Sequence, residues 1–296
     1  MKHYLTILRH CGCLMLAIMV LASSAFAATP SVSNVSSSNQ QDQLALTEEQ
    51  EELDEINADE QTSDENETDF GTDEDNSPSE KVEITPEVLA KVSRYCSFFD
   101  IDMSEDEEFV SAVLEDMNDR GWRDVPGSPE AGMNISVSSV GKIQRFIPQS
   151  KLADIIWTNN PIQPFNHVGI YTTTTKITEA LSKGVQTRKV NQKMDEYPFK
   201  IYKVVKSNST SRYDVDTRRS VATWAKAQVG KKYDKNFFNN KKNTDSNNAK
   251  MNCSELVWKS WKFKASVDLD SNGGPGVYPN NIRKSKRTVC IYKDNS

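Results

Sequence analysis

The sequence predicts an α+β fold, because helical and strand patterns occupy separate stretches of the chain. Residues 85–120 carry apolar side chains at helical spacing. Residues 133–205 instead form short runs rich in β-branched and aromatic side chains, separated by Pro, Asn and Gly. Helical spacing returns over about 215–229 and again from residue 253 to about 262. Segregation of this kind is typical of helices packed against an antiparallel sheet.

Local signals place each element. A first helix is expected from Thr85, an N-cap followed by Pro86 in the first turn, and a second from Ser104 to just before Gly121. These two helices are expected to form an N-terminal appendage or a cover over the core. Strands are expected at seven positions: 133–139, 142–147, 152–158, 166–172, 175–181, 185–190 and 198–205. The later non-helical elements are a polar loop, a turn and a last short strand: 235–250, Gly273–Gly276 and 288–292.

The first 27 residues have the pattern of a secretory signal. Lys2 and Arg9 precede an apolar stretch over residues 11–21, and Ala25–Ala27 matches an A-x-A cleavage site. The apolar stretch is too short to span a bilayer comfortably, and no later segment is long and apolar enough. We therefore expect export to the periplasm or the cell exterior, with no transmembrane segment in the mature chain.

Charge divides the rest of the chain in two. Residues 28–80 hold 17 acidic residues and no Lys or Arg, whereas residues 81–296 hold 25 acidic and 34 basic residues, a net charge of +9. The acidic stretch cannot bury enough apolar surface to fold alone, so we expect a solvated, disordered linker; the alternative is that it shields or spaces the basic part. The basic part suits anionic surroundings such as cell-wall polymers, lipid head groups or acidic peptides. No nucleic-acid partner is expected, because no binding motif is present.

Three cysteines follow the leader: Cys96, Cys253 and Cys290. Exported domains stabilised by disulfides usually carry a larger and even number. One bridge with one free thiol and three free thiols both remain open. With one histidine and scattered cysteines, a zinc site of the usual ligand spacing cannot be built. No metal or other cofactor is expected.

His167 is the one histidine outside the leader, where His3 and His10 lie. A cysteine or serine hydrolase needs a base that titrates near neutral pH, and imidazole is the usual one. If strands 166–172 and 175–181 form a hairpin centred on Thr173, His167 lies directly opposite Glu179 on the same face. A carboxylate there would fix the imidazole tautomer and stabilise the imidazolium.

Gly169 is predicted to share the face of His167. Its missing side chain would let the helix that starts at Cys253 approach closely on that face.

Cys253 is predicted to lie in the first turn of a helix. Asn252 is a favourable N-cap, and Glu255 stands three residues later, as in a capping box. The helix N-terminus and a neighbouring imidazolium would both favour the Cys253 thiolate, and free backbone N–H groups there can stabilise an oxyanion. An apolar stripe would dock this helix against the sheet: Leu256, Val257 and Trp261.

Taken in order, six segments resemble circularly permuted NlpC/P60 proteins, the YiiX/YebB-like branch of the papain-like superfamily, which is related to lecithin:retinol acyltransferase. The segments are 152–156 (LADII), 166–171 (NHVGIY), 177–180 (ITEA) with 184–185 (GV), 230–234 (GKKYD), 252–257 (NCSELV) and 278–282 (YPNNI). The histidine precedes the cysteine, which is the permuted order. Ala153 stands where the family more often has Gly. The resemblance covers roughly residues 133–292.

The resemblance implies a role for four residues. Cys253 would be the nucleophile, His167 the general base and Glu179 the residue that orients the base. Tyr233 matches a family tyrosine near the nucleophile, which would contribute to the oxyanion site or contact the substrate. The implied fold is a permuted papain-like one, with a small antiparallel sheet or half-barrel packed on the cysteine helix. The expected domains are a signal peptide, an acidic linker, a helical appendage and a catalytic domain: 1–27, 28–83, 84–125 and 126–296.

The function expected from these residues is that of an exported cysteine hydrolase. Its thiolate would attack an amide carbonyl and form a thioester that passes to water. Peptide amides are the expected substrates, and peptidoglycan stem peptides suit an exported member. A lipid-directed amidase, thioesterase or acyltransferase is the alternative. A binding protein that keeps the scaffold without turnover is the third reading.

Overall fold

The computed structural model describes residues 82–119, 142–241 and 249–294, together with residues 50, 54, 70 and 71. The expected signal peptide, nearly all of the acidic linker and the expected strand 133–139 lie outside the described residues. Within those described ranges, no helix has the length and apolar character needed to cross a bilayer.

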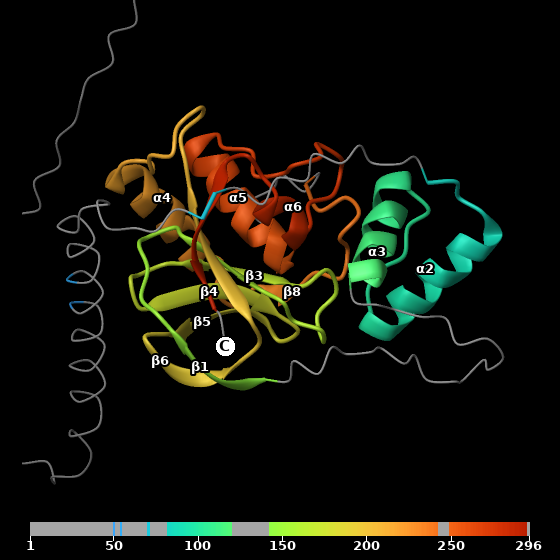
Figure 1. Cartoon of the computed structure of the whole chain (residues 1–296), viewed down its shortest axis with the longest axis horizontal. Helices are drawn as coiled ribbons and strands as arrows, with labels where there is room; N and C mark the ends of the chain where they lie inside the picture. Colours follow the sequence, from blue (N-terminus) through green and yellow to red (C-terminus); the bar gives the residue numbers. More distant parts are fainter. Residues whose placement is uncertain are drawn as a thin grey trace, which may run out of the picture. The chain divides into compact units, whose positions relative to one another are not determined.

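A six-stranded antiparallel sheet forms the centre of the fold (Figure 1), as the α+β prediction requires. Its strand order is β10–β7–β2–β3–β4–β5. Strands β2 to β5 follow one another in the chain and pair as neighbours, and β7 and β10 extend the sheet beyond β2. The strands are β2 (Ile155–Thr158), β3 (His167–Tyr171), β4 (Lys176–Leu181), β5 (Gly184–Lys189), β7 (Phe199–Val204) and β10 (Thr288–Lys293).

Two short ribbons accompany the sheet. Strand β1 (Ile143–Ile147) pairs antiparallel with β6 (Gln192–Glu196), and β8 (Lys232–Tyr233) pairs parallel with β9 (Lys250–Met251). Strand β6 is absent from the sequence-based prediction. Its residues are polar and mostly exposed, so they show none of the apolar alternation that marks a half-buried strand.

Helices α4 (Val215–Lys226), α5 (Cys253–Ala265) and α6 (Pro279–Arg283) lie on one side of the sheet (Figure 1). The predicted apolar stripe of α5 is confirmed, because it shares one buried cluster with sheet residues: Leu256, Val257, Trp261, Ile155, Val168 and Ile170. Burying an aliphatic side chain of this size contributes about 1.5–3 kcal/mol. The opposite face of the sheet has a second apolar cluster that reaches β1: Ile147, Ile156, Tyr171, Ile177, Phe199 and Ile201.

The two expected N-terminal helices are present as α2 (Pro86–Phe99) and α3 (Glu107–Asp119). Thr85 caps α2 as predicted, since its Oγ1 accepts a hydrogen bond from the Val88 amide at 3.2 Å. Helix α3 begins three residues after the expected Ser104, because Ser104 accepts from the Asp106 amide in a turn before the helix. Both helices pack on aromatic residues of the main domain: Phe165, Phe237 and Tyr278.

The contact between α2–α3 and the main domain includes the turn that leads into β3. Phe165 and Asn166 have φ angles of 57° and 69°, in the left-handed region that is costly for a side chain as bulky as Phe. The Phe165 amide donates to the Tyr95 hydroxyl at 3.1 Å and to Asp116 Oδ2 at 3.3 Å. The Tyr95 hydroxyl in turn donates to Asp116 at 2.6 Å. Helices α2 and α3 therefore hold the backbone that places His167.

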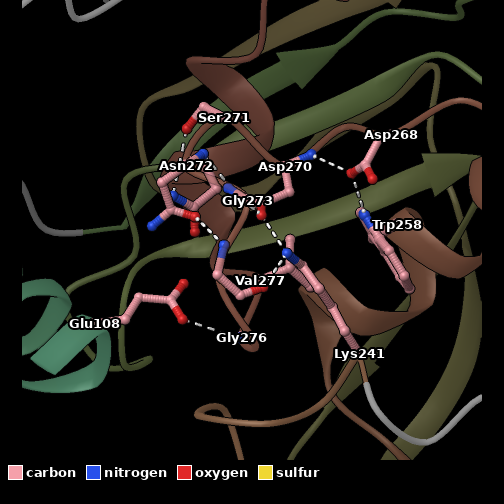
Figure 2. A network of polar contacts seen from close by, with 12 residues as sticks. Glu108, Lys241, Trp258, Asp268, Asp270, Ser271, Asn272, Gly273, Gly276 and Val277 are labelled. Carbon is pink, nitrogen blue, oxygen red and sulfur yellow. Dashed lines mark hydrogen bonds and ion pairs between the residues drawn. The ribbon is translucent and has the colours of Figure 1, made fainter. Parts of the chain in front are cut away.

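Helix α3 makes a second contact with the loop that precedes α6 (Figure 2). The Gly276 amide donates to Glu108 Oε2 at 3.2 Å, and Lys241 binds both Asp270 and the Gly274 carbonyl in the same network. A Cβ at Gly276 would lie 2.6 Å from the Phe237 carbonyl oxygen. Glycine at this predicted turn therefore lets the loop approach the backbone around Phe237.

The Tyr95 hydroxyl contact gives a test of this attachment. Tyr95→Phe removes one acceptor from the Phe165 amide and the donor to buried Asp116, so we expect the free energy of unfolding to fall by about 1–3 kcal/mol. Urea denaturation measures the change. Tyr197→Phe is the matched control, because the Tyr197 hydroxyl makes no hydrogen bond within the ranges that the structure describes. If both substitutions lower the free energy of unfolding equally, the Tyr95 hydroxyl does not have this role in attaching α2 and α3.

Candidate active site

His167 and Glu179 are in contact inside the sheet. Nε2 of His167, at the start of β3, lies 2.8 Å from Oε2 of Glu179 on β4. Their exposed fractions are 3% and 2%, so water does not compete for this contact. Because the carboxylate occupies Nε2, Nδ1 is the ring nitrogen that remains available to exchange a proton with another group.

The predicted register of this hairpin is wrong by two residues. Glu179 pairs with Gly169 and not with His167, because the turn runs over Thr172–Thr175 and is closed by the Thr172 amide donating to the Lys176 carbonyl at 2.9 Å. A shift of two residues keeps every side chain on its face. Glu179 therefore reaches His167 diagonally across the two strands. The predicted contact between the two side chains is present, although the two residues are not directly opposite each other.

The predicted role of Gly169 is also wrong. The cysteine helix packs on the opposite face of β3, against Val168 and Ile170. On the face of Gly169, a Cβ would lie 2.8 Å from Cγ2 of Ile177 and 3.2 Å from Cβ of Glu179. The missing side chain therefore makes room for the β4 side chains, including the base of Glu179.

Cys253 is the first residue of α5, as predicted. The capping box is present: Asn252 Oδ1 accepts from the Glu255 amide at 3.0 Å, and Glu255 Oε2 accepts from the Asn252 amide at 3.3 Å. Asn240 also donates to Asn252 Oδ1, at 3.2 Å. The thiol is 1% exposed. The nucleophile candidate is thus held at a rigid, capped helix N-terminus, which favours a thiolate.

A buried ion pair lies one turn further along α5. Lys259 Nζ donates to Glu255 Oε1 at 2.5 Å, and both side chains are almost fully buried. Burial raises the pKa of the Glu255 carboxyl to about 7, against the opposing charge of Lys259. Lysine four residues after an N-terminal glutamate also completes a favourable helix pair. The pairing of Lys259 with the capping glutamate was not predicted from the sequence.

Both Glu179 and Cys253 influence the charge of the His167 imidazole. Burial alone lowers the pKa of His167, but hydrogen bonds to Cys253 and Glu179 and the negative charges of both outweigh burial and raise the pKa to about 10. Because Glu179 engages Nε2, Nδ1 is the nitrogen left for Cys253; it is buried and has no hydrogen-bond partner within the part of the chain described. This environment favours an imidazolium at neutral pH.

Tyr233 lies in the strand next to the start of α5. It pairs with Met251, two residues before Cys253. Burial, followed by the negative charges of Cys253 and Asp234, raises the pKa of Tyr233 well above its usual value. Its hydroxyl is therefore a proton donor throughout the ordinary pH range, and it is buried without a hydrogen-bond partner among the described residues.

One contact of Glu179 was missed in the sequence analysis. Arg188 Nε on β5 lies 2.8 Å from Glu179 Oε1. Strand alternation places Arg188 and Glu179 on one face, since Arg188 pairs with Ile177 on β4. That alternation was the available sequence signal.

The cysteine question left open by the sequence is answered by the structure: three free thiols. Cys96, Cys253 and Cys290 are all buried and unbridged.

Comparison with known proteins finds a similar family. Residues 145–284 match the model of the family described as permuted papain-like amidase enzymes, YaeF/YiiX, family C92. The matched segment contains all four residues predicted for the site. It also contains Ala153, whose φ of 63° lies in the left-handed region that favours glycine.

Two individual proteins are similar to parts of this chain. The uncharacterized protein YycO of Bacillus subtilis (strain 168) is 38% identical over 165 residues. That match covers 55% of this chain, and the chain spans 63% of the length of YycO. The crystal structure of the metalloprotein YiiX from Escherichia coli O157:H7 is 16% identical, with a TM-score of 0.36 over 50% of this chain and 98% of YiiX.

Thiol reactivity tests the contact between His167 and Cys253. We expect iodoacetamide to alkylate Cys253 at neutral pH at least about tenfold faster in the wild-type protein than in His167→Ala, because the imidazolium stabilises the thiolate. Peptide mass spectrometry measures the rate at each cysteine. Cys96 is the internal control, because burial raises its pKa to about 11. Equal rates at Cys253 in the two proteins would contradict an activated pair.

Proposed function

We propose that the segment 145–284 is a cysteine amidase in which Cys253 is the nucleophile, His167 the acid and base, and Glu179 the residue that orients His167. The carrying observation is the buried contact between Glu179 and His167, with Cys253 close enough to the imidazole to raise its pKa. The match of this segment to an amidase family model supports the same reaction class.

The reaction follows from the charge state of the pair. The Cys253 thiolate attacks the amide carbonyl carbon, and the carbonyl oxygen takes the negative charge of the tetrahedral intermediate. As the C–N bond breaks, His167 gives its proton to the leaving amine and a thioester remains. The neutral imidazole then removes a proton from water, which attacks the thioester and releases a carboxylic acid and the thiolate.

Two groups are suited to stabilise the oxyanion. Backbone N–H groups in the first turn of α5 have no acceptor within the helix, apart from the Glu255 amide that Asn252 caps. We propose that the Tyr233 hydroxyl is the second donor, because it is protonated, buried and without a partner among the described residues. An oxyanion would supply the acceptor that this hydroxyl lacks.

For the substrate, we propose peptide amides outside the cytoplasm, with peptidoglycan stem peptides as the first candidates. The leader-like pattern of residues 1–27 and the net charge of +9 over residues 81–296 support this choice, since cell-wall polymers are anionic. Lipid amides and esters are the alternative substrates.

Substrate incubation separates these possibilities. The full protein is incubated with muropeptides and, separately, with lipid amides and esters, and mass spectrometry detects the products. We expect cleavage of a peptide amide that Cys253→Ala abolishes. Cleavage of the lipid substrates alone would overturn the peptide assignment. Binding without turnover in every case would favour a binding protein on the same scaffold.

Tyr233→Phe tests the oxyanion role. Removing one donor from an oxyanion site costs about 10²–10³ in kcat, whereas KM should change little if the hydroxyl binds the transition state more strongly than the substrate. Steady-state kinetics on the cleaved amide measures both constants. Tyr197→Phe controls for loss of a tyrosine hydroxyl elsewhere. A kcat within twofold of wild type would exclude Tyr233 from this role.

A further inference from the structure

Arg188 binds the catalytic carboxylate on the side away from His167. Its Nε lies 2.8 Å from Oε1 of Glu179, and its Nη2 lies 3.0 Å from Oε2 of Glu196. The Arg188 side chain is 19% exposed, and those of Glu179 and Glu196 are 3% and 11% exposed. Arg188 Nη1 also donates to the Met194 sulfur at 3.0 Å. The guanidinium is thus fixed by three side chains on two strands.

We propose that Arg188 is a positioning residue for the amidase reaction, holding Glu179 ionised and correctly oriented through the step in which His167 loses its charge. The proposal rests on the proposed function of Cys253 and His167. It adds a fifth residue to the site and explains why an arginine stands at this position of β5.

The orientation argument concerns both oxygens of Glu179. Oε2 contacts His167 and Oε1 contacts Arg188, so rotation of the carboxylate would break both contacts. Charge-assisted hydrogen bonds from a planar guanidinium are directional and strong. The carboxylate is therefore locked in the one orientation that keeps Oε2 on the imidazole.

The charge argument concerns the catalytic cycle. A buried carboxylate tends to take up a proton when no cation is near it. During expulsion of the amine, His167 becomes neutral and can no longer supply that cation. Arg188 keeps its charge at every step, so Glu179 remains an anion and is ready to stabilise the imidazolium when it forms again. Consistent with this, burial raises the pKa of Glu179, but the charge of Arg188 and then the contact with His167 hold it below its usual value.

The groups around this carboxylate come from four strands and one helix: His167 and Tyr171 on β3, Glu179 on β4, Arg188 on β5, Glu196 on β6 and Cys253 on α5. Tyr171 stays neutral, because burial raises its pKa far above the usual value. Glu196 balances the charge of Arg188 and is itself fixed by the Tyr197 amide, which donates to its Oε1 at 3.0 Å. Charges along His167, Glu179, Arg188 and Glu196 therefore alternate in sign.

The test compares pH profiles of Arg188 variants. Arg188→Met removes the charge and keeps an unbranched chain, so the acid limb of kcat/KM should move up by about one pH unit or more. The loss relative to wild type should be about 10–100-fold at acidic pH and much smaller at pH 8, where Glu179 ionises without help. Arg188→Lys restores a cation and should return the acid limb toward that of wild type. A purely structural role would lower activity by the same factor at every pH and would overturn the proposal.

Controls separate this proposal from folding and from the proposed function. Arg219→Met, at an exposed ion pair with Asp216 on α4, should leave the profile unchanged. If Arg188→Met does not fold, Arg188→Gln against Arg188→Lys gives the same comparison, and an unshifted acid limb in a folded Gln variant overturns the proposal. The pH profile of Cys253 alkylation is measured in parallel. If the wild type cleaves no amide, the proposed function fails, while the alkylation profile still tests Arg188: a shifted acid limb supports it, and an unshifted one refutes it.

Discussion

The site depends on a carboxylate and an imidazole that meet in the interior of the sheet. Glu179 and His167 are both almost completely buried, at a cost that only strong mutual contacts can offset. Their 2.8 Å contact leaves one imidazole nitrogen for Cys253, and the interactions of His167 with Cys253 and Glu179 together outweigh burial and raise its pKa to about 10. In the proposed mechanism, the same buried pair activates the thiol. The neighbouring helices and strands keep the side chains of His167, Glu179 and Cys253 in place.

Three parts of the structure give this support. The capping box fixes the N-terminus of α5 and with it Cys253. Tyr95 and Asp116 on α2 and α3 hold the left-handed turn at Phe165, directly before His167. Arg188 holds the far side of Glu179. The N-terminal helices are thus connected to the turn before His167 by hydrogen bonds from the Phe165 amide to their side chains, and they are more than a cover over the core.

Short-range patterns predicted much of this arrangement. Alternation placed His167 and Glu179 on one face, and Asn252 with Glu255 placed Cys253 at a helix start, because both depend on residues 12 or fewer positions apart. The register of the hairpin was not predictable in the same way, since Thr172–Thr175 contain no residue that demands one turn type. Strand β6 was missed because its residues are polar. The attachment of α2–α3 depends on hydrogen bonds from Phe165 to Tyr95 and Asp116, which lie 70 and 49 positions away. It also depends on the left-handed backbone at Phe165, which the sequence does not signal.

The charge state of His167 is the most direct test of this account. Nitrogen-15 NMR of histidine-labelled protein can follow it alone, because the other two histidines are His3 and His10, which substitution assigns. We expect both ring nitrogens of His167 to remain protonated through neutral pH and to titrate near 10, and we expect Cys253→Ala to lower that pKa because it removes the thiolate. A neutral imidazole at pH 7 in the wild type, or the same pKa in Cys253→Ala, would contradict the thiolate–imidazolium pair.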